Sequence, residues 1–172
     1  MGKKFELTDK FIINVFGIKL FQIKCTKSFK YAQKGDLGGY VEKEGNLDQE
    51  NDAWVSGDAR VYGDAQVSGD AWVSGDAWVS GNAQVSGNAR VSGDANIKNN
   101  NEHCGFDGFG SCNRHTHAYL TKEKKVEITC GCFRGSIEEF EKKVEETHSG
   151  TIYEKQYKAI INVIKIKFGL TD

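Results

Sequence analysis

The sequence predicts a mainly β protein, in which a short parallel β-helix of about three coils lies between a β-hairpin cap and a small αβ domain. The main observation is a six-residue word, seen in "DAWVSGDAWVSGNAQVSG" at residues 70–87, that recurs with small edits from Asp52 to Lys98. Two β-rich runs precede this repeat, and two helix-capping patterns follow it. We therefore divide the chain into an N-terminal β cap (1–39), the β-helix (40–98), a Gly/Asn-rich connection (99–113) and a C-terminal αβ domain (114–172).

The N-terminal segment contains two runs with strand character, within "KFIINVFGIKLFQIKC" at residues 10–25. Gly17 separates the runs and gives the backbone freedom that a tight turn needs. The second run alternates between two sets of side chains, which is the period-two pattern of a strand: Leu20, Gln22 and Lys24 against Phe21, Ile23 and Cys25. We expect this segment to form a β-hairpin.

The repeated word places an aliphatic residue at every sixth position, at Val55, Val61, Val67, Val73, Val79, Val85, Val91 and Ile97. An alanine stands two residues before each of them. Because side chains two apart on a strand share a face, each Ala-x-Val triplet points a small and a branched side chain inward and the letter between them outward. Ser-Gly-Asp or Ser-Gly-Asn closes most words, and these residues tolerate the backbone angles of turns. Short strands joined by turns at this period indicate a parallel β-helix with three words in each coil.

The word's aliphatic-x-x-x-small-x pattern resembles the hexapeptide-repeat family, and the resemblance implies left-handed coils. Val41 and Leu47 extend the pattern to an earlier register, and the eight-residue gap from Leu47 to Val55 implies a two-residue bulge. At a strand spacing of about 4.8 Å, the coils reach a height of only about 15 Å. A solenoid this short has two apolar ends that need caps. The hairpin and the αβ segment are the expected caps.

The outward letter varies, and outward letters three words apart should stack. One column then holds Trp54, Trp72 and Arg90, a second holds Arg60, Trp78 and Asn96, and a third holds Gln66 and Gln84. A tryptophan can bury about 200 Å², so the columns predict contact surfaces.

Three interpretations of the tryptophan columns stay open. In the first, the rings pack under a loop of the same chain. In the second, they form a subunit interface. A homotrimer is the favoured assembly, because hexapeptide β-helices associate through flat faces. In the third, they are a ligand or partner platform on which the arginines hold an anion.

The C-terminal segment has the pattern of a β-β-α-α domain, with strands expected near His117–Leu120 and Val126–Cys130. Two helices follow, because Ser136-Ile-Glu-Glu139 and Thr151-Ile-Tyr-Glu154 fit the capping box, in which a hydroxyl and a carboxylate satisfy helix-terminal N–H groups. Gly150 is placed to end the first helix. Helical spacing assigns one apolar face of each helix to the core: Ile137, Phe140 and Val144, then Tyr153, Tyr157, Ile160, Ile161, Ile164 and Phe168.

Cysteine and histidine cluster outside the repeat, and the candidates for a zinc site are Cys112, His115, His117, Cys130 and Cys132. Their spacing matches no familiar zinc finger or ribbon. We therefore expect structural thiols, no metal and no cofactor. Cys132 with His148 is a further hypothesis, that of a nucleophile and its base, without a distinctive signature.

The glycine-rich stretch "GFDGFGSCNRH" ends in a basic pair. Its backbone N–H groups, together with Phe109, Arg114 and His115, are candidates to cradle a phosphate. The alternative is an ordinary flexible connection, and both interpretations stay open at this point.

The composition sets limits on the partners. The chain has 172 residues, with 23 Lys and Arg against 24 Asp and Glu, so no global field favours nucleic acid or a membrane. Residues 1–36 carry eight lysines and three acids, which indicates a solvated cap or contact with an anionic partner. No apolar run approaches the roughly 20 residues that cross a bilayer, and no signal-peptide pattern is seen. Five cysteines without an export signal indicate reduced thiols in a cytoplasm.

Two stretches outside the repeat carry a more specific resemblance: "KGDLGGYVEKEGNLDQENDAWV" and "CGCFRGSIEEFEKKVEETHSG". They resemble hexapeptide-repeat proteins from phages and prophages, some of them described as polymer-forming cytoskeletal-like. The resemblance spans nearly the whole chain. It implies a β-helix between a β cap and an αβ domain, encoded by a phage and acting in the cytoplasm of a bacterial host, and it implies no particular activity.

From these observations we expect a non-catalytic, oligomeric binding protein that binds or sequesters a host defence component, either a protein or a small anionic signal such as a nucleotide. The alternatives are an acyltransferase-like or zinc enzyme of the hexapeptide class and a structural, virion-associated protein. Hexapeptide enzymes project histidines from their coils, and this chain has none between residues 40 and 102. Caps at both ends count against polymerisation.

Overall fold

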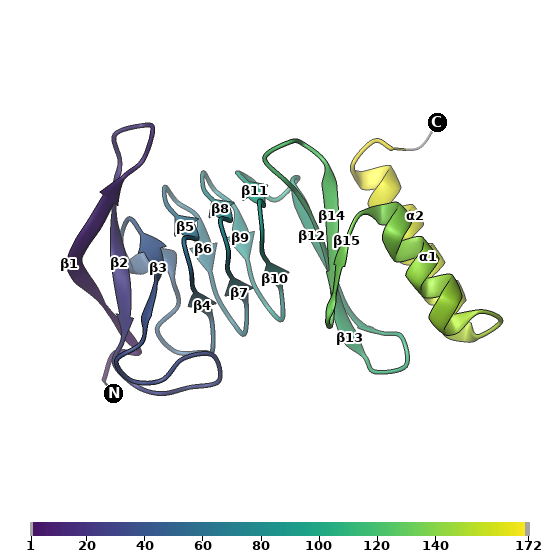
Figure 1. Cartoon of the computed structure of the whole chain (residues 1–172), viewed down its shortest axis with the longest axis horizontal. Coiled ribbons are helices and arrows are strands. Elements are labelled where there is room, and N and C mark those ends of the chain that lie inside the picture. Colours follow the sequence, from purple (N-terminus) through teal and green to yellow (C-terminus); the bar gives the residue numbers. More distant parts are fainter. Residues whose placement is uncertain (1, 171–172) are drawn as a thin grey trace. The chain divides into compact units, whose positions relative to one another are not determined.

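A computed structural model describes residues 2–170 (Figure 1), and these residues divide into two compact units between Asn100 and Asn101. The N-terminal cap and the β-helix, which the sequence analysis separates at residue 39, belong to the first unit together. The division falls just after the last repeat word, where the alternation of alanine and valine stops. The second unit has its own sheet and two helices.

The repeat forms a parallel β-solenoid of about three coils, which confirms the predicted fold class. Each word gives one two-residue strand: β4 (Trp54–Val55), β5 (Arg60–Val61), β6 (Gln66–Val67), β7 (Trp72–Val73), β8 (Trp78–Val79), β9 (Gln84–Val85), β10 (Arg90–Val91) and β11 (Asn96–Ile97). Every third strand pairs in parallel, as β4-β7-β10, β5-β8-β11 and β6-β9. Positions three words apart therefore stack, as Trp54 does on Trp72.

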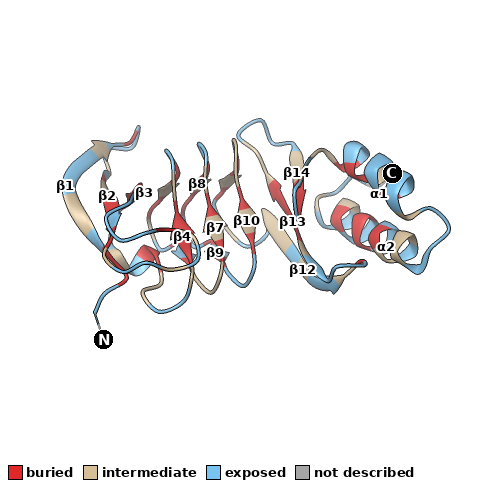
Figure 2. Ribbon diagram, turned by 60° about the horizontal axis from the view of Figure 1, so that its bottom comes forward, coloured by how far each residue is buried: buried red, intermediate tan, exposed pale blue. Residues whose placement is uncertain are grey.

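Alanine and aliphatic side chains fill the interior of the coils. Every alanine and aliphatic residue of the words from Ala53 to Ile97 is at most 1% exposed, and the buried residues recur along the solenoid strands in Figure 2. Strands β4 to β8 each donate a backbone N–H group to the next coil, as Trp72 does to Ala89 at 2.8 Å. Strands this short satisfy their backbone groups only through such neighbours, so each coil stabilises the next.

The first coil carries the two extra residues that the sequence predicts before β4. β3 (Leu37–Val41) pairs in parallel with β5, and Leu47 forms a parallel bridge further along. The aligned pairs are Val41 with Val61 and Leu47 with Val67, so each pair spans three words plus the two extra residues. A short 3-10 helix, Glu44–Asn46, lies between the two pairs, and the buried Asn46 amide donates to two carbonyls of the next coil at 2.8 and 3.1 Å. The bulge is therefore an ordered corner.

The predicted N-terminal hairpin is confirmed, and the structure shows that it extends one sheet of the solenoid. β1 (Phe5–Ile13) pairs antiparallel with β2 (Lys19–Cys25), and β2 pairs with β3, which gives the order β1-β2-β3-β5-β8-β11. β1 is thus the edge strand of this sheet.

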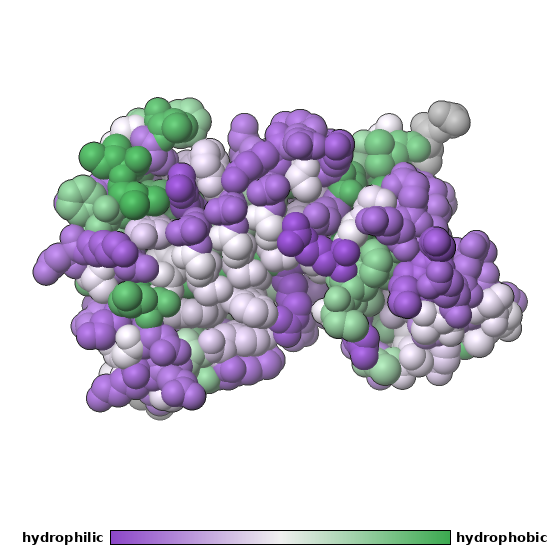
Figure 3. Space-filling view, viewed as in Figure 1, coloured by the Kyte–Doolittle hydropathy of each residue, from purple (hydrophilic) through white to green (hydrophobic). Residues whose placement is uncertain are grey.

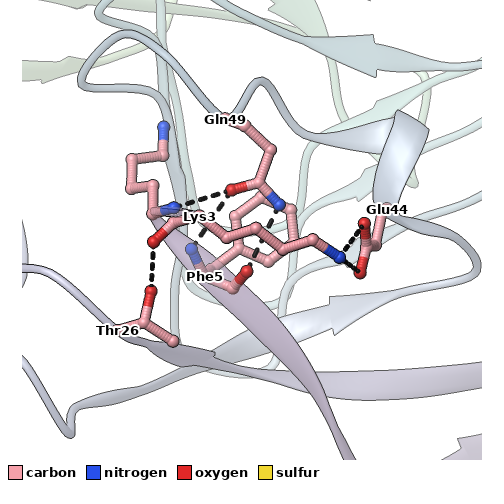
Figure 4. A network of polar contacts seen from close by, with 6 residues as sticks. Lys3, Phe5, Thr26, Glu44 and Gln49 are labelled. Carbon is pink, nitrogen blue, oxygen red and sulfur yellow. Dashed lines mark hydrogen bonds and ion pairs between the residues drawn. The ribbon is translucent and has the colours of Figure 1, made fainter. Parts of the chain in front are cut away.

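A polar network fixes the start of β1 to the first coil (Figure 4). The Gln49 side chain accepts hydrogen bonds from the N–H groups of Lys4 and Phe5, at 2.9 and 3.2 Å, and donates to the Phe5 carbonyl at 3.2 Å. Lys3 Nζ lies 2.7 Å from a Glu44 carboxylate oxygen. Lys4 is buried and donates to the Ala53 carbonyl at 2.8 Å, and burial lowers its pKa. These contacts hold the hairpin in the position expected of an N-terminal cap.

The second unit contains a four-stranded antiparallel sheet instead of the two strands predicted. Its order is β12 (His103–Phe109), β13 (Arg114–Leu120), β14 (Val126–Cys130) and β15 (Phe133–Gly135). The assignment of residues 99–113 to a connection is wrong for β12. Its two glycines conceal the strand, because glycine is depleted in strands and has no side chain to show the alternation.

Two helices complete this unit, α1 (Ile137–His148) and α2 (Ile152–Lys167). Ser136 and Glu139 form the predicted capping box, whereas the Glu154 carboxylate accepts from Gly150 N–H beside the Thr151 cap. All three predicted core residues of α1 are buried. On α2 the buried residues are Tyr157, Ile160, Ile161 and Ile164, while Phe168 is partly buried against the core and Tyr153 is half-buried.

We expect Gly81→Ala to destabilise the solenoid more than Gly87→Ala. Both glycines have a left-handed φ, +60° and +65°, which costs an L-residue about 1–2 kcal/mol. A Cβ at Gly81 would also overlap the carbonyl oxygen of Lys98, whereas a Cβ at Gly87 meets nothing within 4 Å. Urea unfolding followed by tryptophan fluorescence reports on this unit, because Trp54, Trp72 and Trp78 all lie in the solenoid. Equal losses for the two variants would contradict the stacked corners.

Candidate functional site

The first tryptophan column is covered by the chain itself. The edge of the Phe29 ring meets Trp54 at a centroid distance of 5.4 Å, and Tyr31 stacks on Trp72 at 5.6 Å. The Arg90 guanidinium lies 5.4 Å from the Trp72 ring centroid and 5.7 Å from that of Tyr31. Packing under a loop of the same chain therefore holds for Trp54 and Trp72. Trp54, at 2% exposed, is no longer a candidate binding residue.

The second column forms a cation–π stack on another solenoid face. The Arg60 guanidinium lies 5.2 Å from the Trp78 ring centroid, and both residues are half-buried. Two atoms of this column, Arg60 Nε and Asn96 Oδ1, are buried without a hydrogen-bond partner in the described chain. The aromatic ring thus shields part of the guanidinium. Arg60 and Trp78 remain candidates for contact with a partner.

The second unit contains a cavity of about 290 Å³ where its two turns meet α1. Ser111, Cys112 and Arg114 come from the β12–β13 turn and the start of β13, and Cys130, Cys132 and Phe133 come from the β14–β15 turn and its flanks. The helices contribute Phe140, Lys143, Val144, Thr147, His148 and Tyr157. Two turns and two helices therefore converge on one hollow.

Two glycines let the turns approach so closely. Gly110 has φ +74°, donates its N–H to Gln156 at 3.0 Å, and lies where any Cβ would overlap the Tyr157 hydroxyl. Gly131 has φ +60°, and a Cβ there would lie 2.6 Å from Arg114 Nη1. The glycine-rich stretch is therefore an ordered turn that packs on α2 and carries Arg114 over the β14–β15 turn.

Arg114 and His115 do not act together, which corrects the predicted phosphate cradle. Neighbours on a strand point to opposite faces, and only Arg114 lines the cavity. His115 Nδ1 lies 2.7 Å from Asp107, and its Nε2 lies 3.2 Å from His117 Nδ1. His117 continues this row of rings to His103 at 3.3 Å, and burial lowers the pKa of His103 to about 4. Each of the three histidine rings therefore lies within hydrogen-bonding distance of another of the three.

Phe109 is not among the residues that line the cavity, and it packs partly buried against the core of the unit. The sequence-based hypothesis of a ligand contact is therefore not supported at this position.

The zinc candidates are divided between the same two faces of the sheet. Cys112, Cys130 and Cys132 line the cavity, whereas His115 and His117 lie on the opposite face. Within residues 2–170, no group of three or more His, Cys, Asp or Glu side chains is arranged to hold a metal ion.

The cavity combines cationic groups with an aromatic wall. Arg114 and Lys143 are exposed, and no Asp or Glu lines the cavity. Lys143 is 3.7 Å from Glu146, whereas Arg114 has no hydrogen bond or ion pair in the part of the chain that the structure describes. The Phe140 ring packs against Phe133 at 5.0 Å and against Tyr157 at 5.5 Å. Such a lining suits a small anion that carries a flat apolar part.

A larger hollow of about 540 Å³ lies between the two helices, but its charges pair with one another. Lys158 lies 3.3 Å from Glu145, and Lys165 lies 2.7 Å from Glu141. A ligand there would compete with these ion pairs. We therefore take the smaller cavity as the candidate site.

Sequence reasoning identified Arg114 and the cysteines but missed Lys143 and Thr147. A signal was present, because Phe140, Lys143, Val144 and Thr147 follow the i, i+3, i+4, i+7 spacing that places them on one helical face. The two apolar residues enter the core, and the two polar residues extend the same face to the cavity.

A family model described as the YdcK beta solenoid repeat matches residues 65–81 and 83–96. These segments contain β6 to β10 and the first residue of β11, so the match supports a repeat β-solenoid protein and does not reach the cavity. The curated proteins contain no match to the chain. Neither helix of residues 2–170 is long and apolar enough to cross a membrane.

At pH 8 we expect Cys112 and Cys132 to react with iodoacetamide faster than the other three cysteines. Both are exposed, whereas Cys25 and Cys130 are buried. Burial raises the pKa of the half-buried Cys104 to about 11, so only about one molecule in a thousand carries the reactive thiolate there at pH 8. Peptide mass spectrometry gives the rate at each cysteine, and raising the pH to 10 should accelerate Cys104 strongly. Fast labelling of Cys130 would contradict the burial of this thiol.

Proposed function

We propose that the protein is a non-catalytic binding protein whose C-terminal cavity holds a small anionic molecule with a flat apolar part. The observation that carries the proposal is the Arg114 guanidinium, which lines the cavity without an ion-pair partner in the described residues. A guanidinium presents parallel N–H groups that match the two oxygens of a carboxylate or phosphate. Leaving this group unpaired beside a cavity is the arrangement expected of an anion site.

The lining supplies contacts for both parts of such a ligand. The Lys143 ammonium and the hydroxyls of Ser111 and Thr147 add donors for the anion, and the rings of Phe133 and Tyr157 add apolar surface. The volume of about 290 Å³ lies just below the roughly 300–1,000 Å³ of ligand sites. A mononucleotide or a smaller molecule therefore fits this proposal better than a dinucleotide.

Binding is favoured over catalysis by the arrangement of the thiols. A cysteine nucleophile needs a base within hydrogen-bond reach. Cys132 and His148 both line the cavity, but no hydrogen bond joins them in the described residues. Thiol chemistry is therefore the weaker proposal for this cavity.

The wider role follows the resemblance to phage and prophage proteins. We propose that the solenoid belongs with their hexapeptide repeats, that the protein is phage-encoded and cytoplasmic in its bacterial host, and that its ligand is a signal or protein of host defence. We further propose a homotrimer that associates through the face of Arg60 and Trp78, because the Trp54 column is already covered by the chain.

Isothermal titration calorimetry with adenosine monophosphate, with inorganic phosphate and adenosine as its fragments, tests the cavity. Arg114→Gln should weaken binding of the nucleotide at least about tenfold, which is about 1.4 kcal/mol. Lys143→Gln should weaken it less, because Lys143 also faces Glu146. Lys155→Gln, an exposed lysine of α2 outside the cavity lining, is the matched control and should leave binding unchanged.

A native mass spectrum of protein expressed in bacteria complements the titration, since it reports subunit number and any co-purified ligand. If no small anion co-purifies and neither the nucleotide nor phosphate binds, the proposed function fails. An equal effect of Lys155→Gln and Arg114→Gln would reduce the interaction to nonspecific charge attraction.

A further inference from the structure

The turn between β1 and β2 gathers exposed apolar side chains. Phe11, Ile13, Val15 and Phe16 are 45, 65, 78 and 70% exposed. They lie at the tip of the hairpin, which projects past the solenoid coils in Figure 1 and shows as hydrophobic surface in Figure 3. Single exposed apolar residues are ordinary, whereas a contiguous group marks an interaction site.

This turn is ordered by Asn14. Its side-chain oxygen accepts hydrogen bonds from the N–H groups of Phe16 and Ile18, both at 2.9 Å, and its backbone carbonyl accepts from Gly17 at 3.0 Å. Asn14 itself is 7% exposed. Val15 and Phe16 are thus held in solvent by a fixed turn, which lowers the entropy lost when they enter another apolar environment.

The exposed set is not required by the fold. Ile12 and Ile18 pack against the buried cluster of Leu20, Tyr40 and Tyr62 and so hold the hairpin on the solenoid sheet. Because neighbours on a strand point to opposite faces, Phe11 and Ile13 face away from that cluster. The hairpin therefore buries one apolar set and presents a second.

Two lysines, Lys10 on β1 and Lys19 on β2, lie close to this turn in the sequence. Lys19 pairs with Ile13 across the hairpin, and its Nζ lies 3.8 Å from the centroid of the Phe11 ring. Lys10 is exposed on β1, next to Asp9. Residues 7–25, which include the turn, carry Lys10, Lys19 and Lys24 against Asp9, a net charge of +2 (3 − 1). An apolar tip backed by ammonium groups complements a bilayer with anionic head groups.

A second copy of the chain fits this tip less well. Two facing tips would bring their lysines together. The open edge strand β1 is interrupted by a register shift between Leu7 and Phe11 and carries exposed Asp9 and Lys10, which are features that discourage pairing between edges.

We propose that the β1–β2 tip inserts Ile13, Val15 and Phe16 into the interfacial region of an anionic lipid bilayer, with Lys10 and Lys19 against the head groups. The contact is peripheral and reversible. It replaces the sequence-based expectation of no membrane partner, and it is independent of the ligand proposed for the cavity.

Co-sedimentation of the full chain with vesicles tests the proposal. Vesicles that mix phosphatidylglycerol with phosphatidylcholine should bind the protein in a salt-sensitive manner, and phosphatidylcholine alone should bind it weakly. Val15→Ser with Phe16→Ser should lower partitioning at least about tenfold, and Lys10→Gln with Lys19→Gln about fivefold for each lysine. The matched control is Ile152→Ser with Ile166→Ser, two α2 residues that are 61 and 59% exposed and should have no effect.

Failure to sediment with the anionic vesicles, or an equal loss in the α2 control, overturns the proposal. If the tip variant instead changes the oligomeric state measured by light scattering and no vesicle binds, the tip is a protein contact. Arg114→Gln should retain vesicle binding in full, so that failure of the cavity proposal and failure of this one are told apart.

Discussion

The first unit depends on one packing constraint, which is that each word places one alanine and one valine inside a narrow coil. The space admits little else, as shown by the near-complete burial of every inward position from Ala53 to Ile97. Because each strand has only two residues, its backbone groups must bond to the coils on either side. The inward letters and the corners are therefore fixed by the fold, and the outward letter is free to vary.

This constraint explains why the solenoid could be predicted in detail. Self-similarity at a fixed period reveals inward positions, stacking and even the longer first coil that pairs Val41 with Val61. The hairpin and helices were predictable too, because their alternation and capping residues are local. Contacts made across long sequence distances were not predictable: nothing near Phe29 or Tyr31 indicates that these rings cover Trp54 and Trp72.

The candidate site was only half predictable for a related reason. The predicted strand begins near His117, whereas β13 begins at Arg114, so the alternation that separates Arg114 from His115 was not applied at these residues. From the sequence, Lys143 cannot be distinguished from other surface lysines, because only the fold brings the two turns beside it. The surfaces with apparent binding chemistry thus lie outside the regular repeat: an apolar tip in the first unit and a cationic cavity in the second.

The stacked triangular coil is tested most directly by nuclear Overhauser contacts between valine methyl groups. We expect Val73 to contact both Val55 and Val91, its partners three words away in either direction. Val61 should contact Val41 across the longer first coil. Strong contacts between these pairs would support the inward packing on which the face assignments rest. Their absence, or a Val73 methyl group in contact with solvent alone, would contradict it.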